Sequence, residues 1–194
     1  MTHITQDFSH LLGSLKGISE AQLSAHFKLY EGYVKKLNEI EEKLVTADRA
    51  ATNYSYGEYS ELKRREAVAF NGSYLHQMYF ENLSGEESAP SEALAAEIEK
   101  VFGSMENWVT DVKAAAAATP GWLLLTWNLV DKKLHNYIMY EHHIGLPVHQ
   151  VPVMALDCWE HAFMIDFGTK KAEYLTAFLD NLDWNVINER FGNL

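Results

Sequence analysis

The chain has 194 residues, enough for one domain or for two small lobes that share a core. Its 47% hydrophobic and 22% charged residues are typical of a globular protein and exclude a disordered one. The 27 acidic residues outnumber the 16 basic ones, so the net charge is -11, and without a basic run we expect no nucleic-acid partner and no anionic-membrane surface.

The first half of the chain predicts two long helices. Apolar residues recur at helical intervals over residues 23–44, and Ser19 supplies a cap before them. A polar and aromatic stretch at 53–57 interrupts this pattern, and residues 59–83 predict a second helix of similar length that ends at Ser84-Gly85. Two such helices in sequence predict an antiparallel hairpin.

The second half predicts shorter helices around a small sheet. Helices are expected behind the cap residues Ser91 and Ser104, and the second of them runs through an alanine run to Pro120. Aromatic and β-branched residues predict strands at 122–130, 134–141 and 151–156, of which the first two form a hairpin. Three more helical pieces are expected at 159–167, 173–182 and 184–191.

Together these elements predict an α+β fold. We expect an N-terminal domain, residues 1–88, made of the long antiparallel α-hairpin, which packs on a C-terminal α/β domain, residues 89–194. In the second domain the helices surround a three-stranded antiparallel sheet. The longest apolar run, 122–125, is far short of the ~20 residues that span a bilayer, and the first residues lack the parts of a secretory signal. We therefore expect a soluble, cytoplasmic protein without a membrane partner.

Asp157 and His161 are the most informative pair of side chains. They are four residues apart, so if the third strand passes into a helix here, their Cβ atoms lie about 5–6 Å apart on one face. Carboxylate and imidazole bonds to a divalent metal are each about 2.0–2.2 Å long, so both side chains can reach one ion. In the alternative, Asp157 caps the helix and His161 is a histidine packed in the core.

Two more histidines, His26 and His76, lie inside the predicted apolar helices. An imidazole within a helical hairpin needs a partner for its ring nitrogens, because an unpaired polar group there costs on the order of 1–3 kcal/mol. A metal ion is one such partner and a hydrogen bond is another. With Asp157 and His161 they make three imidazoles and one carboxylate, which suit iron, manganese or zinc. The single cysteine, Cys158, excludes an internal disulfide and a zinc site with several thiolates.

Several parts of the chain carry motifs that occur together in one family. They are HFKLYEGYVKKLN at 26–38, FNGSYLH at 70–76, the pair FGS at 102–104 and GW at 121–122, and DCWEHAF at 157–163. By these motifs the sequence resembles the iron/manganese superoxide dismutases, whose signature D-x-W-E-H-A-[FY] matches the last segment. The resemblance extends across nearly the whole chain.

The resemblance implies an enzyme that disproportionates superoxide to O2 and H2O2 by one-electron cycling of a mononuclear iron or manganese, with iron preferred. It implies the metal ligands His26, His76, Asp157 and His161. It also implies that Tyr33 and His142 hydrogen-bond the solvent on the metal and relay protons. His142 stands where the family carries a glutamine or, in some members, a histidine.

The resemblance further implies a homodimer or a dimer of dimers, in which Glu160 pairs with the metal-ligating histidine of the other subunit. The alternative is that Glu160 is only a first-turn carboxylate that the helix dipole stabilises, and we favour the contact between subunits. The residues that usually connect the two subunits near the metal differ, because Tyr30 or Leu29 replaces a histidine and Met164 replaces a tyrosine. The interval from His26 to Tyr33 is also one residue shorter than the family pattern.

Two other classes of protein stay open. A non-haem iron or zinc enzyme uses a similar ligand set with one open position, and it would need a pocket for an organic substrate. A non-catalytic member of the same fold would have a structural or interaction role. Trp122 and Trp159 are interpreted as an apolar wall around the site or as core, and Cys158 as a buried apolar residue. Lys28 or Arg190 could help to attract an anion.

Overall fold

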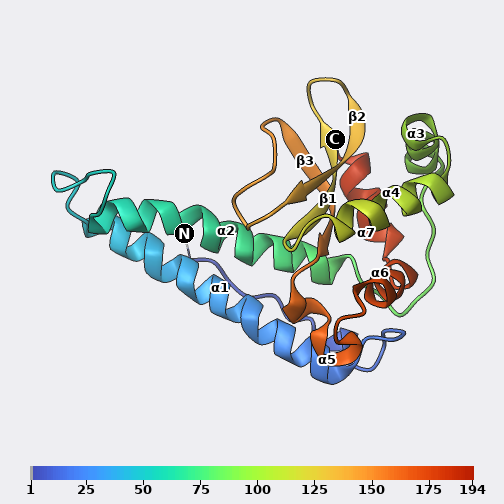
Figure 1. Ribbon diagram of the computed structural model, residues 1–194, viewed down its shortest axis with the longest axis horizontal. Coiled ribbons are helices and arrows are strands. Elements are labelled where there is room, and N and C mark those ends of the chain that lie inside the picture. The colour runs from blue at the N-terminus through green and yellow to red at the C-terminus, as the bar shows by residue number, and fades with distance from the viewer. Residues whose placement is uncertain (1) are drawn as a thin grey trace.

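The long helical hairpin is the most prominent feature of the molecule. The computed structural model of the chain describes residues 2–194. Helices α1 (Glu20–Thr46) and α2 (Glu58–Glu81) lie side by side and project beyond the rest of the molecule (Figure 1). Ser19 caps α1, since its side chain accepts a hydrogen bond from the backbone N–H of Gln22, as the sequence predicts. The apolar residues that α1 buries follow the predicted spacing: Leu23, Tyr30, Val34, Leu37 and Ile40.

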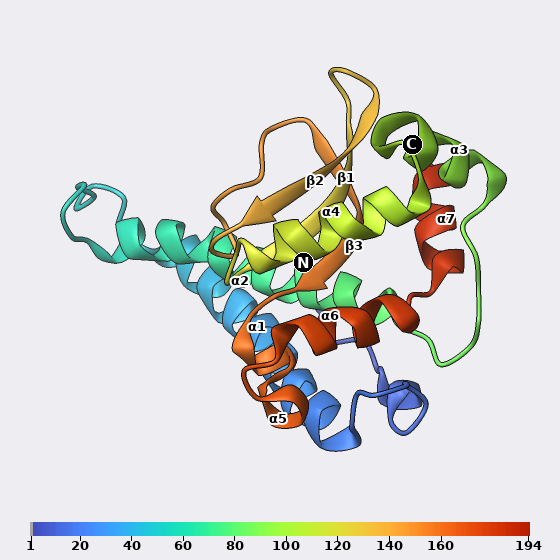
Figure 2. The same cartoon turned by 45° about the vertical axis from the view of Figure 1, so that its right-hand side comes forward.

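A three-stranded antiparallel sheet and short helices make up the rest. The strands are β1 (Trp122–Asn128), β2 (Lys133–Met139) and β3 (Gln150–Asp157), with β1 in the centre. The helices are α3 (Glu92–Phe102), α4 (Met105–Ala117), α5 (Met164–Phe167), α6 (Lys171–Asp180) and α7 (Trp184–Gly192). Helix α4 contacts β1 and β2, whereas α2 contacts β3, so the sheet lies between the hairpin and α4 (Figure 2).

These elements confirm the predicted α+β fold with its helical hairpin and its antiparallel sheet. One continuous apolar core joins the hairpin to the sheet, for it contains Leu23 and Tyr79 as well as Trp122 and Leu156. The division into domains 1–88 and 89–194 stays a prediction. No described helix is long and apolar enough to cross a membrane.

The prediction of one helical piece at 159–167 is wrong, because this segment forms two short helical turns. The chain forms a 3-10 helix, η2 (Glu160–Ala162), and then the short α5. Phe163 separates them with φ -145°, which no α-helix accepts. Its buried ring stacks on Tyr174 of α6 with ring centroids 5.2 Å apart. Packing of this ring against α6 therefore replaces a regular helix with two short turns.

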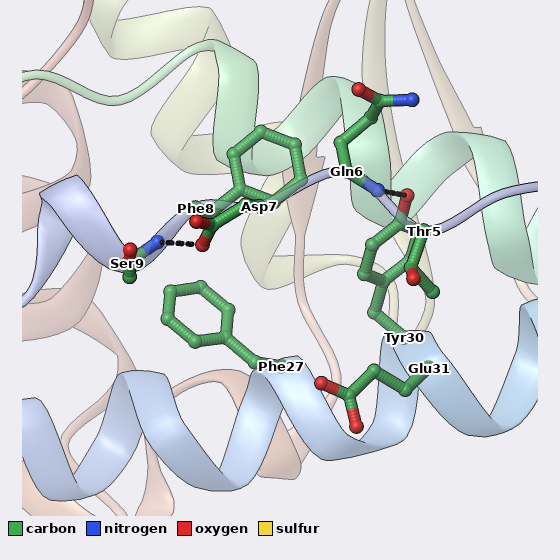
Figure 3. Close-up of a pocket in the computed structure, with 8 residues that line it drawn as sticks. All are labelled: Thr5, Gln6, Asp7, Phe8, Ser9, Phe27, Tyr30 and Glu31. Atoms are coloured by element: carbon green, nitrogen blue, oxygen red, sulfur yellow. Dashed lines mark hydrogen bonds between the residues drawn. The ribbon is translucent and has the colours of Figure 1, made fainter.

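The N-terminal segment lies along the hairpin and contains a 3-10 helix, η1 (Ser9–Leu11), which the sequence pattern does not predict. The backbone N–H of Gln6 donates to the Tyr30 hydroxyl over 3.0 Å (Figure 3). The His3 ring lies 2.7 Å from the Tyr74 hydroxyl and 2.9 Å from Glu41 Oε1. The His3 side chain is thus partly buried against the hairpin.

Candidate metal centre

The four predicted ligands converge where the hairpin meets the sheet. His26 comes from α1, His76 from α2, Asp157 from the end of β3 and His161 from η2. One ligand atom of each lies within 4.8 Å of the others. The first three residues are fully buried, and the His161 side chain keeps 27% of its exposure. The structure therefore brings together residues that lie up to 135 positions apart in the chain, from residue 26 to residue 161.

The sequence suggested that Asp157 and His161 lie on one face of a helix. In the structure they meet through a turn instead. Asp157 is the last residue of β3, opposite Trp122 of β1. Its Oδ1 accepts a hydrogen bond from the backbone N–H of Trp159 over 2.9 Å, which turns the chain out of the strand. The 3-10 helix that follows returns His161 to the carboxylate. Both side chains face the same point because of this turn.

Three imidazole nitrogens surround one carboxylate oxygen. Asp157 Oδ2 lies 3.0 Å from His26 Nε2, 3.1 Å from His161 Nε2 and 3.4 Å from His76 Nε2. Burial by itself would raise the pKa of Asp157, but the adjacent His161 and His26 rings hold it well below its usual range. The carboxyl group is therefore an anion inside the protein. Burial lowers the pKa of His161, and the Asp157 carboxylate outweighs this effect and raises it overall.

The protonation of His76 can be read from its hydrogen bond. Its Nδ1 lies 2.5 Å from the carbonyl oxygen of Gly72, which can only accept, so Nδ1 carries the proton. Burial lowers the pKa of His76 to about 3, which keeps the ring neutral. The lone pair of Nε2 then faces the ionised Asp157 carboxylate, so that two acceptors lie 3.4 Å apart. A cation held between these groups would satisfy both, and the residues present fit a metal ion with nitrogen and oxygen ligands.

Tyr33, His142 and Trp122 form a hydrogen-bonded chain beside the four ligands. The Trp122 indole, which can only donate, lies 2.9 Å from His142 Nδ1, so Nδ1 is the acceptor. Burial lowers the pKa of His142 and keeps the ring neutral, with its proton on Nε2. This Nε2–H donates to the Tyr33 hydroxyl over 2.7 Å. The Tyr33 ring stacks on His76 with ring centroids 5.3 Å apart, so the chain ends beside the centre.

The short interval between His26 and Tyr33 suits the helix that carries them. Helix α1 is uninterrupted over both residues, and at about 3.6 residues per turn seven residues make nearly two full turns. Both side chains therefore lie on one face. Tyr33 also needs Gly72 on α2, because a Cβ atom at Gly72 would overlap the Tyr33 ring.

Two tryptophans and a cysteine line the surroundings. The Trp122 ring lies 5.0 Å from the His76 ring, and the Trp159 ring lies 6.4 Å from the His161 ring. Both indoles thus form an apolar wall, and Trp122 is part of the core as well. Cys158 is buried, and burial raises the pKa of its thiol to about 12. It is a buried apolar residue, as the sequence indicated.

Arg190 lies away from the centre, contrary to the idea that it attracts an anion. Its guanidinium donates to Asn82 Oδ1 over 2.6 Å and contacts Glu81. Sequence reasoning also missed Tyr174, whose hydroxyl donates to the carbonyl oxygen of Asp157 over 2.7 Å. The signal for Tyr174 is weak, because this contact forms only when α6 packs behind β3.

Comparison with known proteins identifies the family. Residues 90–190 match the model of the C-terminal domain of iron/manganese superoxide dismutases. An iron superoxide dismutase of Aquifex aeolicus is 38% identical and covers 97% of this chain and 92% of that protein. One of Aquifex pyrophilus is 39% identical over 92% of this chain and 86% of its own length. A manganese superoxide dismutase of Halobacterium salinarum is 35% identical over 91% and 88%. The chain belongs to the iron/manganese superoxide dismutase family.

Proposed function

We propose that this chain is a superoxide dismutase, which converts two superoxide ions and two protons into O2 and H2O2. The observation that carries the proposal is the buried cluster in which three imidazole Nε2 atoms surround one carboxylate oxygen. The relatives named superoxide dismutase match nearly the whole chain.

In this proposal the metal ligands are His26, His76, Asp157 and His161. Iron or manganese, when bound, supplies the one-electron redox chemistry that the side chains of this cluster lack. Zinc fits the same ligand types but has no redox chemistry, so it does not support this function. We favour iron, because the two Aquifex relatives, at 38% and 39% identity, are named as iron enzymes, whereas the manganese relative is 35% identical.

Tyr33 and His142 are the proposed proton-relay residues. The superoxide ion that is reduced must gain one electron and two protons before it leaves as hydrogen peroxide, and general acids contribute by holding a proton close to the reacting atom. Because His142 Nε2–H donates to the Tyr33 oxygen, the Tyr33 hydroxyl keeps its own proton for donation. Burial raises the pKa of Tyr33, which keeps the phenol protonated in neutral solution. Tyr33 is partly exposed, so solvent can return the proton.

We propose that the protein acts as a homodimer or a dimer of dimers with Glu160 at the contact. Glu160 and His161 line the same open cavity, together with Trp159. Close by, Met164 and Ile165 of α5 are 41% and 58% exposed. Apolar side chains beside a carboxylate are suited to an interface. The cytoplasmic location stays a prediction.

Bound-metal analysis together with a superoxide-decay assay tests the function. We expect about one iron or manganese per chain and rapid decay of superoxide. His161→Ala removes one imidazole ligand, so this variant should lose both the metal and the activity. His10→Ala changes an exposed histidine and is the matched control, which should keep both. Full activity in His161→Ala would contradict the proposal. A tightly bound metal without superoxide decay would favour another metal enzyme or a non-catalytic member of the fold.

A further inference from the structure

Gln22 of α1 holds the turn that carries His161. Its side chain is almost completely buried, with 1% of the residue exposed. The amide Nε2 donates to the carbonyl oxygen of His161 over 2.6 Å. The amide Oε1 accepts from the backbone N–H of Ile165 over 3.0 Å. One side chain therefore connects α1 to both ends of the segment between η2 and α5.

A second contact holds the same segment to the same end of α1. The backbone N–H of Ser19, the cap residue, donates to Asp166 Oδ2 over 2.7 Å. Gln22 reaches from α1 to the segment, and Asp166 reaches from α5 back to α1. The two contacts together fix the position of η2 and α5 relative to the start of α1.

This attachment bears directly on the metal centre. Gln22 and His26 are four residues apart on α1, so they lie on one face, one helical turn from each other. The same helix face thus presents His26 and fixes the backbone of His161. The distance between His26 and His161 therefore depends on the side-chain amide of Gln22.

His161 needs such support more than His76 does. His76 lies in a long helix, and its Nδ1 is held by the Gly72 carbonyl. His161 lies in a three-residue 3-10 helix, and among residues 2–194 the hydrogen bonds and the ion pair of its side chain all involve Nε2. Outer partners normally orient the ligating histidines of metal sites. For His161, the described residues provide that support through the backbone.

We propose that Gln22 is a positioning residue of the metal centre, which sets the place of His161 relative to His26 and thereby slows the loss of the ion. The proposal rests on the proposed metal site and does not depend on the reaction that the site performs. It assigns to Gln22 a role separate from those of the ligands and of the proton relay.

The test compares three substitutions in the iron-loaded protein. Gln22→Met keeps the side-chain length and removes both hydrogen bonds. Gln22→Glu keeps an acceptor for Ile165 and loses the donor to the His161 carbonyl. Gln150→Met is the matched control, since Gln150 accepts from Thr126 over 2.8 Å at the opposite end of β3. The measurements are the rate of iron release to a chelator, the visible absorption band of the ferric protein and the thermal unfolding midpoint.

We expect both Gln22 variants to release iron about 10–100-fold faster than the parent, as outer-shell substitutions do, and to shift the absorption band. Gln150→Met should leave the release rate and the band unchanged. If Gln22→Met does not fold, Gln22→Glu, which keeps the volume and one hydrogen bond, provides the comparison. A lower unfolding midpoint with unchanged release and an unchanged band would overturn the inference. Failure of the parent protein to retain iron or manganese would instead overturn the proposed function, and this inference with it.

Discussion

Gly72 sets the position of Tyr33, because the Tyr33 ring occupies the space that a Cβ atom at Gly72 would need. In Gly72→Ala the ring must move, and its 2.7 Å hydrogen bond to His142 is lost. We expect the free energy of unfolding to fall by about 1–3 kcal/mol, as for other overpacked sites. Superoxide decay should slow by about tenfold or more, since a positioned proton donor contributes about 10²–10⁴-fold. The metal content should not change.

Gly32→Ala is the control for this substitution. Gly32 also lies in a helix, next to Tyr33, but a Cβ atom there meets nothing within 4 Å. We expect a gain of about 0.5–1 kcal/mol in unfolding free energy from helix propensity. Activity should stay the same. Full activity and unchanged stability in Gly72→Ala would contradict the proposed role of the Tyr33 position.

At this scale the sequence predicts residue types better than contacts. The spacing of Asp157 and His161 and the burial of His26 and His76 in apolar helices indicate four potential ligands. Contacts made through the backbone leave no such pattern. The hydrogen bond from His76 to the Gly72 carbonyl becomes visible only in the structure.

The end of α2 is joined to β3 and α7 by a buried polar network. Asn82 is fully buried, donates to the carbonyl oxygen of Ala155 over 2.8 Å and accepts from Arg190 over 2.6 Å. Asn82→Ala removes both hydrogen bonds and leaves their partners unsatisfied. We expect a loss of about 3 kcal/mol in unfolding free energy, since each such loss costs about 1–3 kcal/mol.

Urea unfolding measures this loss, and the dependence of the free energy on urea concentration should stay the same. Asn193→Ala, at an exposed position near the end of the chain, is the control and should stay within about 0.5 kcal/mol of the parent. An unfolding free energy of Asn82→Ala that also stays within about 0.5 kcal/mol of the parent would show that the network does not join these elements.

The sequence predicted the helices and strands correctly where the periodic pattern of apolar residues extends over many positions. Helix α1 and the three strands agree with the predicted ranges to within a few residues. The segment at 159–167 differs because the Phe163 ring packs on Tyr174. A local pattern contains no information about a packing partner on another helix, so it predicts one helix where two short turns form.

The metal centre as a whole depends on contacts over long distances in the chain. His26 and Asp157 are 131 residues apart and meet only when the hairpin packs on the sheet. The four-residue spacing can indicate Asp157 and His161 as a pair of ligands. It cannot predict that α1 and α2 contribute to the same site. For these two helices the apolar surroundings of His26 and His76 indicated candidate ligands, and the resemblance to a family implied that they share one metal ion with Asp157 and His161.

Burial of the cluster has a consequence for the stability of the metal-free protein in acid. His76 has a pKa of about 3 in the folded protein against an ordinary value of 6.5. As the pH falls below 6.5, the unfolded chain takes up a proton that the folded chain refuses, so the unfolding free energy decreases towards pH 3. Asp157, whose pKa is lowered, adds a loss in the same direction below its ordinary value of 3.8.

His161 acts in the opposite sense, because its pKa is raised, so its contribution is present below pH 6.5 and is lost at higher pH. We expect the net change in unfolding free energy to follow His76, since burial also lowers the pKa of His26, which adds a loss in the same direction. Urea unfolding of the chelator-treated protein at pH 7, 5.5 and 4.5 checks this. His76→Leu should weaken the dependence on pH. An unfolding free energy that is constant or rises towards acid would contradict the expected titration of His76.

Anomalous X-ray scattering from crystals of the metal-loaded protein, recorded at the iron and manganese edges, tests the metal centre most directly. We expect one strong peak per chain, about 2.0–2.2 Å from the ligand atoms of His26, His76, Asp157 and His161. Its edge identifies the metal, and iron is the expected one. A crystal of active protein with no peak between these four side chains, or with its metal bound elsewhere, would contradict the proposed site.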